Sequence, residues 1–132
     1  MSSKNTLAIQ AAVLNQSYKI PFNGKYSWLY VGEAALAFIT SVSKDLTDAN
    51  VFNLNGSCET IENGIKIIKE LEKNSDISCV NQPFPFPPDL DDGPLRKHIG
   101  SYPSISVKKG IRDTFNAFKE LKLEGRCPSL SE

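Results

Sequence analysis

The chain has 132 residues, which is enough for one hydrophobic core and short for two. Its 15 basic and 15 acidic residues balance without a long run of either sign, so it carries no electrostatic footprint for nucleic acid or an anionic membrane. Three cysteines without a CxxC pair and a single histidine argue against a disulfide framework or a metal site, and no apolar run could span a bilayer. We therefore expect a cytoplasmic protein with reduced thiols and a single domain over residues 1–132.

The first predicted element is a helix from about Lys4 to Gln16, capped by Ser2 or Ser3. One lysine before an apolar patch is also typical of a weak signal peptide, but Gln10 interrupts the patch. The spacing of the apolar residues favours an amphipathic helix over a signal peptide: Leu7, Ile9, Ala11, Ala12 and Leu14.

Two strands and a second helix follow. The strands are predicted near Tyr18–Ile20 and Tyr26–Val31, joined by a tight turn at Asn23 and Gly24, which tolerate positive φ angles. A helix should run from Glu33 to about Lys44, because a carboxylate in the first turn is favoured by the helix dipole. Its apolar residues lie nearly all round, so it requires partners on more than one side: Ala34, Leu36, Ala37, Phe38 and Ile39.

The middle of the chain predicts a buried strand over VFNLNG, residues 51–56, closed by Gly56. Thr60 is then a candidate N-cap for a helix over Ile61–Lys73, which Gly64 weakens by roughly 1 kcal/mol relative to alanine. A short strand is expected from Ile77.

Four prolines and two phenylalanines between Gln82 and Pro88 predict an extended crossover pinned by Phe84 and Phe86, or alternatively a proline-rich ligand for a partner domain. Pro94 marks the start of a short helix. Its Leu95 and Ile99 are expected to face the protein interior, and whether His98 also faces inward stays open. Ser106 should cap the last helix, whose apolar stripe is Val107, Ile111, Phe115, Phe118 and Leu121.

Three segments stand in a recognisable order: YVGEAA from Tyr30, PFPFPPDLDDGPLRKHIG from Pro83, and YPSISVKKGIRDTFNAF from Tyr102. Together they resemble the carboxyl-terminal half of extended short-chain dehydrogenases, the NAD-dependent epimerase/dehydratase family, over roughly residues 5–122. The resemblance implies an α/β fold that is the carboxyl-terminal portion of a Rossmann-type enzyme, without the amino-terminal dinucleotide-binding βαβ units.

The parts that would carry the family's chemistry are absent from these residues. The eight glycines never take the GxxGxxG spacing that cradles a cofactor pyrophosphate. The catalytic tyrosine with a lysine four residues later is also missing, because the four tyrosines are followed at that distance by Phe22, Tyr30, Ala34 and Ser106. We therefore assign no catalytic, cofactor-binding or metal-binding residue, although the resemblance implies NAD(P) for the full-length family.

By position in that family, the residues nearest the substrate would be Tyr18, Phe22, Tyr26 and Trp28. Many sugar-nucleotide members carry an arginine where Tyr26 falls, and its absence favours a smaller polar substrate, with a sugar or sugar derivative among the candidates. As an alternative, Tyr26, Trp28 and Tyr30 serve only as core and edge protection of a strand. Glu33, similarly, would cap its helix and not touch a ligand.

Three functional hypotheses remain open, and whether the chain is an enzyme stays undecided. The first is a truncated or split epimerase/dehydratase-like oxidoreductase that retains the substrate-binding half and is inactive alone. The second is a non-catalytic α/β module that binds a small ligand or a partner, either as a homodimer or docked on a separate Rossmann subunit. The third is an unrelated interaction protein whose helix 33–44 is buried in a dimer.

Overall fold

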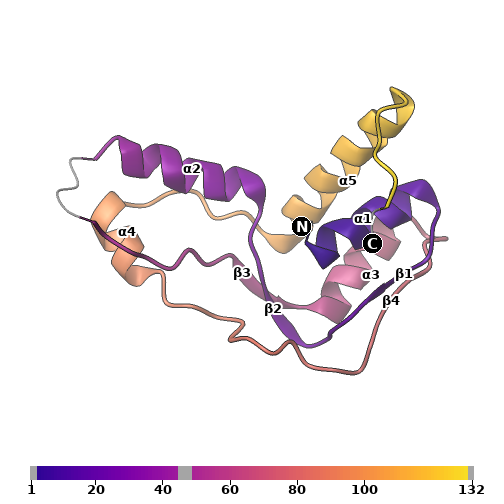
Figure 1. Ribbon diagram of the computed structural model, residues 1–132, viewed down its shortest axis with the longest axis horizontal. Coiled ribbons are helices and arrows are strands. Elements are labelled where there is room, and N and C mark those ends of the chain that lie inside the picture. Colours follow the sequence, from indigo (N-terminus) through magenta and orange to yellow (C-terminus); the bar gives the residue numbers. More distant parts are fainter. Residues whose placement is uncertain (1–2, 45–48, 131–132) are drawn as a thin grey trace.

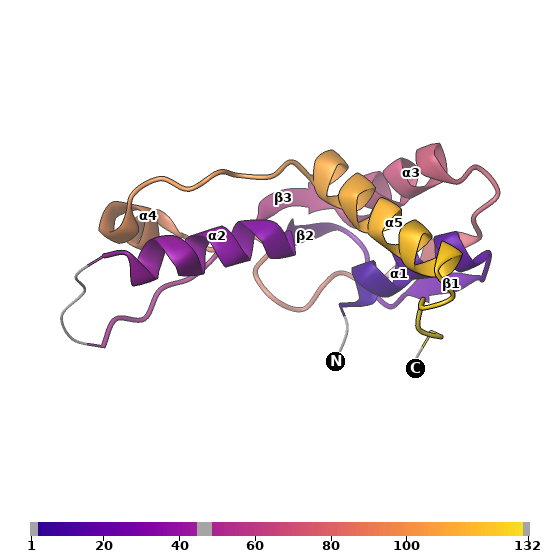
Figure 2. The ribbon, with the colours of Figure 1, turned by 90° about the horizontal axis from the view of Figure 1, so that it is seen from above.

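The computed structural model describes residues 3–44 and 49–130, which form an elongated α/β structure (Figures 1 and 2). The described residues contain five helices: α1 Lys4–Leu14, α2 Val31–Val42, α3 Ile61–Leu71, α4 Gly93–Ile99 and α5 Val107–Leu123. They also contain four short strands: β1 Tyr18–Ile20, β2 Lys25–Trp28, β3 Ser57–Thr60 and β4 Ile77–Cys79. Helices α1, α3 and α5 gather at one end with β1 and β4, α2 and α4 lie at the other end, and β2 and β3 stand between them (Figure 1).

The strands form two separate pairs, so the predicted turn does not join two neighbouring strands. β1 pairs with β4 in parallel, and β2 pairs with β3 in the antiparallel sense. Gly24 has the expected positive φ of 76°, but Asn23 does not. Instead, the Asn23 amide donates to the Gln82 carbonyl at 2.7 Å, and its carbonyl accepts from the Phe84 amide at 3.2 Å. The proline-rich segment thus occupies the hydrogen-bonding edge that a hairpin would have used.

The main hydrophobic core lies among α1, α3, α5, β1 and β4. The predicted first helix is confirmed, but it is not amphipathic, because it packs between the β1–β4 pair and α5 and eight of its 11 residues are buried. It ends at Leu14 and not at Gln16, since Asn15 takes the left-handed conformation at φ 56°. Ser3 is its N-cap residue but makes no side-chain capping bond.

Two predicted N-caps are confirmed by their hydrogen bonds. The hydroxyl of Thr60 accepts from the Asn63 amide at 3.2 Å, and that of Ser106 accepts from the Lys109 amide at 3.3 Å. Each bond satisfies one of the free N–H groups at the start of α3 and α5. Ile111 and Phe115 of the predicted α5 stripe are buried in the main core.

The predicted strand over residues 51–56 is wrong, because β3 begins only at Ser57. No strand lies beside 51–56 in the described residues, and a strand without a neighbour cannot satisfy its backbone groups. Its side chains instead hold the segment in place: the Asn55 amide donates to Asp89 at 2.8 Å, and Asn53 donates to the Asp91 carbonyl at 3.4 Å.

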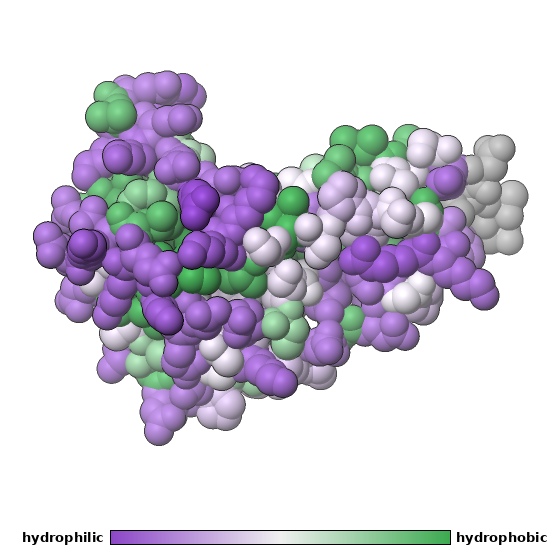
Figure 3. Space-filling model, turned by 180° about the vertical axis from the view of Figure 1, so that it is seen from behind, coloured by the Kyte–Doolittle hydropathy of each residue, from purple (hydrophilic) through white to green (hydrophobic). Residues whose placement is uncertain are grey.

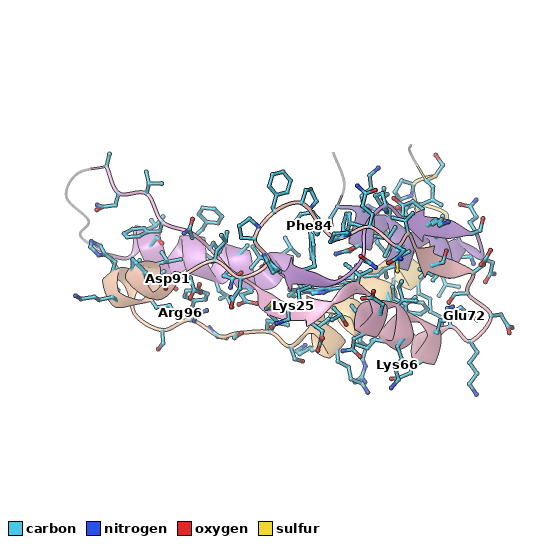
Figure 4. All side chains as sticks on the ribbon, turned by 90° about the horizontal axis from the view of Figure 1, so that it is seen from below. Lys25, Lys66, Glu72, Phe84, Asp91 and Arg96 are labelled. Carbon is cyan, nitrogen blue, oxygen red and sulfur yellow. The ribbon has the colours of Figure 1, made fainter. Side chains whose placement is uncertain are left out.

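A second, smaller core joins α2 to α4. Leu95 and Ile99 of α4 turn inward as predicted, and they pack with Ala37 and Tyr102. His98 does not turn inward; it is exposed, with its ring centroid 5.0 Å from that of Phe52. This core is supported by Arg96, whose guanidinium lies 4.2 Å from the Tyr102 ring centroid. Figure 4 shows Arg96 and Asp91 at this end of the molecule.

Candidate functional site

Five aromatic rings form a connected group, the aromatic cluster, near the junction of β1, β2 and the proline-rich loop. Phe22 stacks on Tyr26 at 5.4 Å between ring centroids, and Phe84 lies 4.8 Å from each of them. Trp28 stands edge-on to Tyr26 at 6.0 Å, and Phe86 adds to Phe84 at 5.4 Å. Ring pairs at these distances add stabilisation beyond their buried area and present aromatic faces and edges to a neighbouring molecule.

The cluster depends on the parallel pairing of β1 with β4, which continues beyond both strands. The Val80 amide donates to the Ile20 carbonyl at 3.0 Å, and the bonds at Asn23 extend the pairing to Phe84. Phe84 is thereby held beside β2 (Figure 4). Both Phe84 and Phe86 were predicted to anchor this loop. Phe84 is half-buried, as an anchor should be, but Phe86 is 66% exposed and does not anchor it.

The structure brings together three of the four residues predicted to lie near a substrate. All four pack against the main core, but only Phe22, Tyr26 and Trp28 belong to the aromatic cluster. Tyr18 is not among its touching rings. Burial raises the pKa of the Tyr18 phenol. Phe84 was missed as a member of the site, because only its pairing with Asn23, more than 60 residues earlier in the chain, places it there.

A cleft of about 220 Å³ adjoins the aromatic cluster through Tyr26 and Trp28. It lies between the first turn of α1, one edge of β2 and the first turn of α5, and it also includes Tyr30. Among residues 3–44 and 49–130, no charged side chain lines it. The arrangement can therefore enclose a small molecule against aromatic and aliphatic walls, with neutral polar groups to orient it.

Trp28 has a structural role as well as a position on the cleft. Its indole N–H donates to the Glu59 carbonyl at 3.2 Å, and its ring lies so close to Gly64 of α3 that a Cβ there would overlap it. The sequence also allowed an alternative in which the alternating aromatic residues of β2 belong to the core. This alternative holds for the face of Trp28 that packs against α3.

The described residues show no arrangement of groups for metal chemistry, since no group of three or more His, Cys, Asp or Glu side chains could hold an ion. Arg112 is exposed, and the carboxylate of Asp113 pairs with Lys109 at 2.6 Å. No helix in the described part of the chain is both long and apolar enough to cross a membrane.

The exposed side of α2 is the largest apolar feature outside the cleft. Only Glu33 and Ala37 of this helix are buried. Four large apolar side chains are mostly exposed, and we call them the α2 face: Val31 at 74%, Phe38 at 70%, Ile39 at 67% and Val42 at 88%. Figure 3 shows apolar surface gathered along this helix. Contiguous exposed apolar patches of this kind are typical of interaction sites.

No family model matches the sequence, and no curated protein matches it either. The fold, however, is similar to that of solved members of the NAD-dependent epimerase/dehydratase family. UDP-glucuronic acid 4-epimerase from Bacillus cereus superposes with a TM-score of 0.76 and 13% identity, over 91% of this chain and 40% of that one. An epimerase from Methanothermobacter thermautotrophicus gives 0.76 and 18%, over 95% and 39%.

A partial-consensus L-threonine 3-dehydrogenase gives a TM-score of 0.74 at 19% identity, over 89% of this chain and 42% of that one. The chain therefore spans about two fifths of the length of these structures. At such identities the likeness is one of fold: an α/β portion of an extended short-chain dehydrogenase.

Proposed function

We propose that the chain is the carboxyl-terminal, substrate-binding portion of an NAD(P)-dependent epimerase/dehydratase-like oxidoreductase. In this proposal a separate Rossmann portion supplies the cofactor site and the Tyr/Lys pair, which these 132 residues lack. The chain contributes the aromatic cluster and the adjoining cleft, where a small polar substrate binds. By itself it neither binds NAD(P) nor turns over substrate.

The observation that carries this proposal is the α2 face. Its four large apolar side chains meet solvent. The same helix shares the smaller core with Phe52 and Leu54, which belong to a segment, residues 51–54, that has no strand neighbour in the described residues. Val51 in that segment is 96% exposed. A sheet that added a strand beside 51–54 and packed on α2 would pair with the backbone of this segment and bury the apolar face. The family resemblance implies such a sheet in the Rossmann portion.

Sequencing the transcript upstream of the Met1 codon tests the proposal. We expect an in-frame or separately encoded segment with a strand, a glycine-rich turn and a helix. The reconstituted protein should bind NAD⁺ or NADP⁺ in a calorimetric titration, and the chain alone should not. A chain that melts sharply as a monomer and has no such segment would instead be a free-standing binding module.

The α2 face should make the isolated chain self-associate. Replacing Phe38 and Ile39 together by lysine is expected to give a monomer in sedimentation velocity, since each exposed side chain gains about 1.5–3 kcal/mol when it is fully buried in an interface. Leu123→Lys is the matched control, because Leu123 is 81% exposed at the end of α5 and lies off the α2 face. Equal association of both variants would contradict the assignment of α2 as the docking surface.

A further inference from the structure

The cleft lies at the joint between the two ends of the molecule. Part of its lining belongs to the main core and includes Ile9 of α1 and Ile111 of α5. Another part is formed by Tyr30, which directly precedes α2, and by Ile105 in the segment that leads into α5. α2 begins just after β2, in the middle of the molecule, and extends away from the main core (Figure 1). A cleft between two separately packed units changes its shape when one unit moves relative to the other.

Two contacts connect α2 to this part of the lining. Glu33 is fully buried in the first turn of α2, and its Oε2 accepts from the Ile105 amide at 3.1 Å. Tyr30, the N-cap residue of α2, packs against α5, where a Cβ at Gly110 would lie 3.4 Å from the Tyr30 Cβ. Tyr30, Ile105 and Gly110 all line the cleft. The connection between α2 and the start of α5 therefore runs through the wall of the cleft.

α2 is held less firmly than the helices of the main core. Only Glu33 and Ala37 of its 12 residues are buried. Ala37 packs in the smaller core with Leu95, Ile99 and Tyr102, and the buried residues of that core are separate from those of the main core. A helix that buries so few side chains opens at a lower free energy than the rest of the fold. The cleft therefore depends on a helix that needs further support.

We infer that α2 carries a movable wall of the cleft and that Glu33 is the positioning residue that couples this wall to α2. When α2 opens, Glu33 releases the Ile105 amide and Tyr30 leaves Gly110, so the cleft loses this wall. When the α2 face is docked on a partner, both contacts persist and the cleft keeps its shape. Docking at α2 and ligand binding in the cleft thus strengthen each other, because such linkage is reciprocal. The inference rests on the proposed function for the identity of the docked partner, but the coupling within the chain does not depend on it.

The test is amide hydrogen exchange, followed by NMR, on the 132-residue chain carrying Phe38→Lys and Ile39→Lys to prevent self-association through the α2 face. Ala35→Gly weakens α2 at an exposed position, and Ala117→Gly weakens α5 in the same way as the matched control. Ala35→Gly should speed exchange of the α2 amides and of the Ile105 amide about fivefold, the factor that corresponds to the lower helix propensity of glycine. Ala117→Gly should leave the Ile105 amide within about twofold of its rate in the parent, because this position is distant from the joint.

Substitutions of Glu33 separate coupling from a simple helix cap. In the Glu33→Ala background the Ile105 amide should exchange fast and no longer respond to Ala35→Gly, while the α2 amides still respond. Glu33→Gln keeps an acceptor for the Ile105 amide and should restore its response. Protected amides in α1 and α3 verify that each variant is folded. The inference is overturned if Ala35→Gly leaves Ile105 unchanged, if Ala117→Gly speeds it equally, or if Ile105 still follows Ala35→Gly without Glu33. No partner or substrate takes part, so these outcomes are distinct from a failure of the proposed function.

Discussion

Gly64→Ala is expected to lower the free energy of unfolding by about 1–3 kcal/mol, in the range of overpacked cores. A Cβ at position 64 would overlap Cζ2 and Cη2 of the Trp28 ring. The ring cannot easily yield, because its N–H is bonded to the Glu59 carbonyl and its edge contacts Tyr26. Relief therefore requires α3 to move away from β2. Urea denaturation followed by tryptophan fluorescence measures the loss and reports directly on the displaced ring.

Gly110→Ala is the matched control, since Gly110 also lies inside a helix. A Cβ there would meet Tyr30 Cβ at 3.4 Å, an ordinary contact. Alanine should then raise stability by about 0.5–1 kcal/mol through helix propensity alone. If Gly64→Ala were neutral or stabilising like Gly110→Ala, the close approach of Trp28 to α3 would be wrong.

Local features of the fold could be predicted from the sequence where the signal lies within a few residues. The hydroxyls of Thr60 and Ser106 cap helices where their positions predict it, because a cap depends only on the following turn. Gly64, by contrast, carries only a propensity cost in the sequence. Its reason for being glycine is the Trp28 ring, which arrives from 36 positions away and is visible only in the structure.

Pairing between distant segments explains most of what was missed. An Asn-Gly pair between two apolar runs predicts a hairpin, and only the parallel pairing of β1 with β4 shows that Asn23 bonds to Gln82 and Phe84. The same pairing adds Phe84 to the candidate site and leaves Tyr18 against the core. Val51, Phe52 and Leu54 predict a strand over residues 51–56, but such a strand forms only beside a neighbour. The described residues contain no strand that pairs with it.

Asn5 and Glu33 show a further limit of sequence reasoning. Both are polar residues in the first turn of a helix, where capping or exposure is the ordinary expectation. In the structure both are buried; the two polar side-chain atoms of Asn5 and Oε1 of Glu33 have no hydrogen-bond partner. The sequence contains no signal for this, because burial depends on which segments cover the turn. For Glu33 that segment is the one that leads into α5.

Glu33→Ala is expected to cost about 1.5–3 kcal/mol, the range for a hydrogen bond to a charged group. Glu33 is fully buried, and its Oε2 accepts from the Ile105 amide at 3.1 Å. The Ile105 carbonyl in turn accepts from the Ser57 hydroxyl at 3.0 Å, so the carboxylate links α2 to β3 through this one residue. Without it the Ile105 N–H loses this acceptor, and α2 loses its side-chain link to the segment that leads into α5.

Amide hydrogen exchange distinguishes this role from a simple helix cap. Glu33→Ala should speed exchange throughout α2 and α4 while α1 and α3 stay protected, because the two ends of the molecule have separate cores. Glu33→Gln keeps an acceptor for the Ile105 amide and should lower the free energy of unfolding by less. The control is Glu120→Ala, on the exposed part of α5, whose free energy of unfolding should stay within about 0.5 kcal/mol of the parent. If exchange rose only in the first turn of α2, Glu33 would be a cap and nothing more. A rise across both helices would mean that this buried carboxylate holds α2 and α4 in position relative to the main core.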